Sequence, residues 1–125
     1  MMALIIKCKN DGETIAYGIQ DKTAFEFEGH WYFDPEVVNM EYLNITERTY
    51  NCPYKGVCRW IDLETASVQA RNIGWVYRLP LTGYEFIKDK IAFFARDTAG
   101  TIAVYSDGDH EIPLPPEQED TGETP

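Results

Sequence analysis

Apolar and polar residues alternate along several short stretches of the chain, as they do in β-strands that bury one face. In residues 23–28, Phe25 and Phe27 fall on one face while Glu26 and Glu28 fall on the other. Residues 73–79 show a similar pattern, and the β-rich stretches at residues 57–63, 91–95 and 101–105 predict three more strands. Residues 57–63 are apolar on both faces, which is typical of a strand covered on both sides.

Turn residues join these strands into predicted hairpins. Asp11-Gly12 suits a type I′ turn between strands at residues 1–8 and 13–19. Ala99-Gly100 predicts a hairpin between the strands at 91–95 and 101–105. A third turn, at residues 28–30, leads into a strand at 31–33.

Helix signals are few. Asp34-Pro35 predicts one short turn of helix, because Asp suits the N-cap and Pro the first helical position. Residues 81–87 could form another short turn. The chain therefore reads as all-β, with about seven to nine short strands in a sandwich or open barrel.

Charge divides the chain of 125 residues, whose formal net charge is −10. Residues 107–125 hold seven acidic residues and four prolines, with no Lys, Arg or aromatic residue. Such a segment buries too little apolar surface to offset the entropy lost on ordering. We predict one β domain over residues 1–106 and an acidic flexible tail over 107–125. Ile112 and Leu114 are the side chains able to hold the start of the tail against the domain.

The charge, the apolar runs and the cysteine count exclude several classes of protein. An acidic chain is unsuited to coating the phosphates of duplex nucleic acid, and apolar runs as short as residues 3–6 are too short for a membrane helix. Three cysteines leave an odd thiol, and the spacing of Cys52 and Cys58 matches no common zinc site. We expect a cytoplasmic protein without a disulfide, a bound zinc ion or a secretory signal.

One part of the chain is positive. Residues 48–78 hold five basic and two acidic residues, and they also carry Tyr50, Tyr54, Trp60, Trp75 and Tyr77. This combination predicts a concave pocket with an aromatic wall and one or two cations, which suits a small planar or anionic ligand.

The string Cys52-Pro53-Tyr54-Lys55-Gly56 resembles the signature of the domain-of-unknown-function 427 family, whose family naming carries a nucleotidyltransferase-like label. Residues 31–38, 74–80 and 87–94 resemble three further family segments in the same order, so the resemblance covers residues 3–105. It implies a β-tent fold, in which two antiparallel sheets pack at a steep angle with minimal helix. It also implies a pocket lined by residues 52–56 and 75–77.

The resemblance and the positive stretch together predict one ligand-binding site. Its candidate residues are Cys52, Tyr54, Lys55, Arg59, Trp75 and Tyr77. The alternative is structural: Arg59 would pair with an acid such as Glu26 or Glu47, and both Trp75 and Tyr77 would belong to the core.

Three functions follow as hypotheses. The first is binding of a small anionic or nucleotide-like ligand, with no particular cofactor or reaction implied. The second is a metal-dependent nucleotidyltransferase, because Asp62 and Glu64 have the spacing that places two carboxylates on one face of a strand. The third is a protein-interaction module that uses the tail or an aromatic patch.

Overall fold

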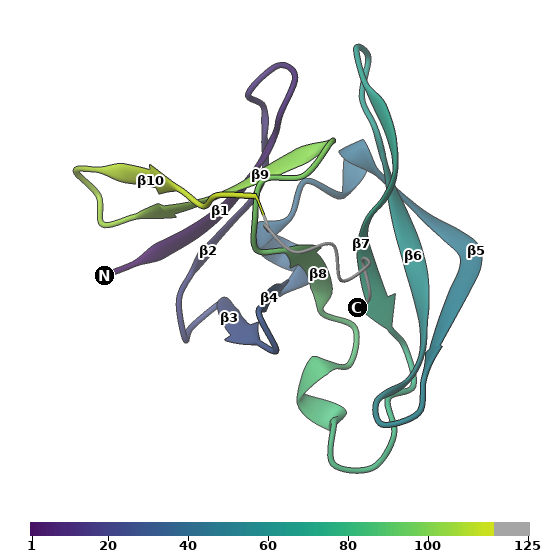
Figure 1. The fold of residues 1–125 in the computed structure, drawn as a ribbon. Helices are drawn as coiled ribbons and strands as arrows, with labels where there is room; N and C mark the ends of the chain where they lie inside the picture. Colours follow the sequence, from purple (N-terminus) through teal and green to yellow (C-terminus); the bar gives the residue numbers. More distant parts are fainter. Residues whose placement is uncertain (117–125) are drawn as a thin grey trace.

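The computed structural model describes residues 1–116 and shows two antiparallel β-sheets (Figure 1). The four-stranded sheet has the order β10-β9-β1-β2 and contains β1 (Ala3–Cys8), β2 (Thr14–Ile19), β9 (Thr101–Ser106) and β10 (Glu111–Pro113). The six-stranded sheet has the order β3-β4-β8-β7-β6-β5. Its strands are β3 (Ala24–Phe27), β4 (His30–Phe33), β5 (Leu43–Cys52), β6 (Gly56–Glu64), β7 (Gln69–Tyr77) and β8 (Ile91–Phe94).

The predicted all-β class with minimal helix is confirmed. Helical structure in residues 1–116 is limited to three single turns, η1 (Pro35–Val37), η2 (Met40–Tyr42) and η3 (Glu85–Ile87). Within the same residues, no helix has the length and apolar character needed to cross a membrane. The steep angle between the two sheets stays a prediction.

Two predicted hairpins form and one does not. Gly12 turns β1 into β2, and Glu28-Gly29 turns β3 into β4, each with a positive φ that suits such turns. The hairpin predicted at Ala99-Gly100 is wrong, because β8 and β9 belong to different sheets. β9 pairs with β1 instead, so this connection passes from one sheet to the other.

The six-stranded sheet has two covered faces. Residues that lie opposite each other on antiparallel neighbours point to the same face, so the strand register assigns each side chain. One face packs on the four-stranded sheet and forms the inter-sheet core, which includes Leu4, Ile6, Trp31, Ile61, Val76 and Phe93. The opposite face carries a second cluster, which includes Tyr32, Cys58, Trp75, Tyr77, Ala92 and Phe94.

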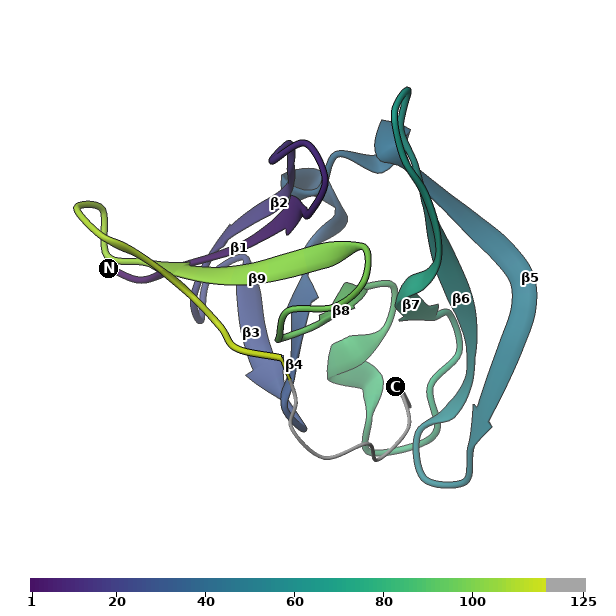
Figure 2. The ribbon, with the colours of Figure 1, turned by 45° about the horizontal axis from the view of Figure 1, so that its top comes forward.

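The hairpin of β5 and β6 projects beyond the four-stranded sheet (Figures 1 and 2). On β6, Ile61 and Leu63 are buried in the inter-sheet core, whereas Val57 and Arg59 are exposed. We predicted that residues 57–63 are covered on both faces. The structure covers both faces only toward Ile61 and Leu63.

The ordered sheet extends into the segment that we predicted to be a tail. β10 pairs with β9 through Glu111, Ile112 and Pro113, and the amide of Leu114 donates to the carbonyl of Ala103 (2.8 Å). Leu114 also packs against the inter-sheet core. The charge pattern did not reveal this strand because all its side chains are exposed. Residues 117–125 lie outside the described residues, and the prediction for them stays a prediction.

The contacts of Leu114 predict a difference between two neighbouring substitutions. Leu114→Ala should lower the free energy of unfolding by roughly 1 to 2 kcal/mol, because it removes a partly buried side chain from the core. Ile112→Ala, at an exposed position of the same strand, should change it by less than about 0.5 kcal/mol. Urea unfolding of both variants measures this, and equal effects would contradict the packing of Leu114.

Candidate functional site

The cluster on the face of the six-stranded sheet that points away from the four-stranded sheet, which we call the outer aromatic cluster, is set by strand register. Trp75 lies opposite Trp60 of β6 and Ala92 of β8, and Tyr77 lies opposite Cys58. The Trp75 ring has its centroid 4.9 Å from that of Phe94, and its Nε1 donates to the hydroxyl of Tyr32 (3.3 Å). Aromatic side chains from four neighbouring strands thus form one continuous wall.

Lys55 reaches this wall from the turn between β5 and β6. The backbone amide of Lys55 donates to Sγ of Cys52 (3.4 Å), and its carbonyl accepts from the amide of Leu81 (2.8 Å). Gly56 follows with φ of 109°, a conformation that side chains rarely adopt, and a Cβ there would lie 3.3 Å from the carbonyl oxygen of Leu79. The turn therefore fixes the backbone of Lys55 against the connection between β7 and β8.

The ammonium group of Lys55 is buried among rings. Its side chain is only 5% exposed, and Nζ lies 5.8 Å from the ring centroid of Phe27 and 5.9 Å from that of Tyr77. These distances allow cation–π attraction. Nζ also donates to the carboxylate of Glu28, whose side chain is 49% exposed on the β3–β4 turn. The site thus holds a buried cation whose carboxylate partner reaches solvent.

The hydroxyl of Tyr77 is a further polar group of this region. It is buried and forms no hydrogen bond of ordinary geometry among residues 1–116, although the Cys58 thiol on the neighbouring strand interacts with it. Burial raises the pKa of this hydroxyl far above its ordinary value, and burial likewise raises the pKa of Tyr32. Both tyrosines are therefore neutral at pH 7, and Tyr77 keeps a hydrogen that it can donate.

Cys8, Cys52 and Cys58 are all free and buried. Burial raises the pKa of the Cys58 thiol to about 11, and the interaction with the Tyr77 side chain, followed by the backbone at Tyr50 and the Lys55 ammonium, lowers it only in part. Because the thiolate is the reactive form, Cys58 is inert at neutral pH.

Four of the six candidate residues come together and two do not. Lys55, Trp75 and Tyr77 share the outer aromatic cluster, with Cys52 at the turn beside Lys55. Tyr54 is 73% exposed. Arg59 lies opposite Val76, on the other face of the sheet, and within residues 1–116 it forms no ion pair with Glu26 or Glu47.

Sequence reasoning missed part of the aromatic wall. Phe27 and Glu28 approach Lys55 only because β3 joins β7 through β4 and β8. The alternation in residues 23–28 placed Phe25 and Phe27 on one face, which was the available signal, but it could not show what that face would meet.

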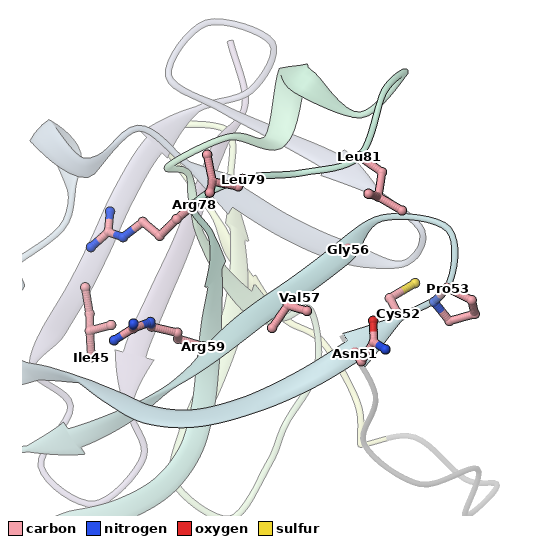
Figure 3. Close-up of a pocket in the computed structure, with 10 residues that line it drawn as sticks. All are labelled: Ile45, Asn51, Cys52, Pro53, Gly56, Val57, Arg59, Arg78, Leu79 and Leu81. Carbon is pink, nitrogen blue, oxygen red and sulfur yellow. The ribbon is translucent and has the colours of Figure 1, made fainter.

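Arg59 lines a separate groove of about 770 Å³ on the opposite face of β6 (Figure 3). The groove is lined by Ile45, Asn51, Cys52, Pro53, Gly56, Val57, Arg59, Arg78, Leu79 and Leu81. Cys52 is the one candidate residue that borders both regions. The predicted aromatic wall and the predicted second cation thus lie at different places.

Asp62, one of the two carboxylates proposed for a metal-dependent enzyme, contacts other side chains and the backbone of the protein. The carboxylate of Asp62 accepts from the guanidinium of Arg48 and from the amide of Asn72 (2.9 Å). Within residues 1–116, the structure holds no group of three or more His, Cys, Asp or Glu side chains suited to a metal ion. The nucleotidyltransferase alternative gains no support from this geometry.

Fold and site together define a class of protein: a small all-β domain of two antiparallel sheets, with a buried lysine against an aromatic sheet face. The chain belongs to the family described as Domain of unknown function (DUF427), whose model matches residues 4–105. No curated protein matches the chain. The predicted family membership is confirmed.

The raised pKa of Cys58 predicts alkaline destabilisation. Its pKa rises from 9.0 to about 11 on folding, so the folded state resists ionisation that the unfolded state allows. This pKa difference contributes roughly 2 to 3 kcal/mol to the free energy of unfolding. The contribution is fully present below pH 9 and is lost as the pH rises toward 11. Urea unfolding at increasing pH should show a steeper fall for the natural chain than for Cys58→Ala. Parallel curves for the two proteins would contradict the burial of this thiol.

Proposed function

We propose that the protein binds a small anionic ligand with a planar ring, and that the ligand contacts the outer aromatic cluster. The observation that carries this proposal is that a buried Lys55 ammonium and a buried Tyr77 hydroxyl, which forms no hydrogen bond of ordinary geometry among residues 1–116, lie in one cluster. A buried polar group without an ordinary hydrogen bond costs stability, so its presence favours a role outside folding.

Both groups suit an anion. Lys55 supplies a positive charge in a poorly hydrated place, where electrostatic attraction is stronger than in water. Tyr77 supplies a neutral O–H donor at physiological pH. The carboxylate of Glu28 balances the charge of Lys55, but it stands half-exposed on a two-residue turn. An anionic group of the ligand can therefore replace Glu28 while that carboxylate returns to water.

The surrounding rings suit a planar body. Phe27 and Tyr84 are only partly buried beside the fully buried Trp75 and Tyr77. Aromatic faces attract other aromatic rings in stacked or edge-on arrangements. A nucleotide, which joins a planar base to a phosphate, has both features that the site would recognise.

We propose binding and no reaction of the ligand, because Cys58 is a neutral thiol and the carboxylate of Asp62 is paired with Arg48.

Tryptophan fluorescence tests the proposal, because Trp60 and Trp75 lie in the cluster. Titration with adenosine monophosphate should give saturable quenching in the natural chain. Lys55→Met should weaken binding roughly tenfold or more, the scale of a lost hydrogen bond to a charged group. Lys22→Met, which removes an exposed lysine elsewhere, should leave the affinity unchanged.

Tyr77→Phe separates binding from folding. Removing a buried hydroxyl that forms no hydrogen bond of ordinary geometry should change the free energy of unfolding by no more than about 1 kcal/mol. The same change should weaken binding of adenosine monophosphate roughly tenfold. Saturable binding that is equal in the natural chain, Lys55→Met and Tyr77→Phe would overturn the proposed site, and absence of binding would overturn the nucleotide-like ligand.

A further inference from the structure

The groove of Figure 3, which we call the arginine groove, has walls that are fixed by the backbone. One wall is the end of the β5–β6 hairpin, and the other is residues 78–81. The two are joined by the hydrogen bond from the amide of Leu81 to the carbonyl of Lys55 (2.8 Å). Gly56 lets them approach closely, since a Cβ there would lie 3.3 Å from the Leu79 carbonyl oxygen. The groove is therefore formed before any ligand arrives.

The charge of the groove is opposite to that of the protein. The chain has 21 acidic and 11 basic residues, yet among residues 1–116 the charged side chains that line the groove are those of Arg59 and Arg78, without a carboxylate. Figure 3 shows both guanidinium groups extending toward the same end, beside Ile45. Arg78 pairs with Asp89 at 3.2 Å, but both side chains are half-exposed, and such pairs contribute little. This end of the groove favours an anionic group.

Aliphatic side chains line much of the rest of the groove. Leu79 is 81% exposed, and Val57 and Leu81 are each about half-exposed. Exposed aliphatic side chains that gather in one concavity mark a binding site more often than scattered ones do. Within the part of the chain that the structure describes, the lining residues include no aromatic ring, in contrast to the outer aromatic cluster on the other face of the sheet.

We propose that the arginine groove binds a soluble aliphatic anion, such as a medium-chain carboxylate. The head group would lie between Arg59 and Arg78, and the hydrocarbon chain along Val57, Leu79 and Leu81. A volume of about 770 Å³ lies in the range of small-molecule sites, which favours such a ligand over a folded partner. Guanidinium groups recognise carboxylates by paired hydrogen bonds. This site is distinct from the one proposed at Lys55.

Decanoate, below the concentration at which it forms micelles, is the probe. Methyl NMR spectra of the full chain should show saturable shifts at Val57, Leu79 and Leu81. The double variant Arg59→Gln/Arg78→Gln should weaken binding roughly tenfold or more. Arg71→Gln, an exposed arginine outside the groove, is the matched control and should bind like the natural chain. All three arginines are exposed, so the variants should fold, and thermal melts verify this.

Two further probes define the ligand class. Decanol, with the same chain and no charge, and butyrate, with the charge and a short chain, should each bind roughly tenfold more weakly than decanoate. Lys55→Met should bind decanoate normally, which separates this site from the proposed function. Absence of saturable shifts, equal affinity in the double variant, or shifts confined to the outer aromatic cluster would overturn the proposal. Dimer formation without decanoate would also overturn the proposal, if sedimentation detects the dimer and the same methyl signals shift as it forms. A second copy of the chain would then fill the groove.

Discussion

Burial of strand β7 on both faces is the constraint on which the rest of the structure depends. Val76 points into the inter-sheet core, while Trp75 and Tyr77 point into the outer aromatic cluster, and all three are fully buried. Gly74 makes this possible, because a Cβ there would lie 2.4 Å from the carbonyl oxygen of Ala92. Only glycine lets β7 and β8 pair so closely, and this pairing holds the two halves of the six-stranded sheet together.

The same arrangement brings a cation into an apolar environment. Lys55 comes from the β5–β6 turn on one side of β7, and Phe27 and Glu28 come from the β3–β4 hairpin on the other. The buried ammonium needs a compensating charge, because desolvation of an isolated ion is expensive. Glu28 supplies that charge from a half-exposed position, so the charge balance can pass to an incoming anion. The opposite face of β6 offers a different environment, where the exposed Arg59 and Arg78 accompany aliphatic side chains.

The sequence predicted those features that depend on local pattern. The strand near residues 23–28 followed from alternation, and the turn at Gly12 followed from its sequence. β5 was missed because polar residues such as Asn44 fill it and its register shifts between Ile45 and Thr49, which breaks the alternation. Long-range features could not be predicted. Arg59 and Ile61 lie on the same face of β6, but the size of the smaller sheet, which leaves Arg59 uncovered, is not encoded in β6 itself.

The central claim is that the face of the six-stranded sheet carrying Trp75 and Tyr77 receives a ligand beside Lys55. Intermolecular nuclear Overhauser effects between bound adenosine monophosphate and the full chain test it most directly. We predict contacts from the adenine protons to the rings of Phe27 or Tyr84, which are partly buried members of the cluster. Contacts from the bound nucleotide to Val57 and Leu79 alone, or to neither face of the sheet, would contradict it.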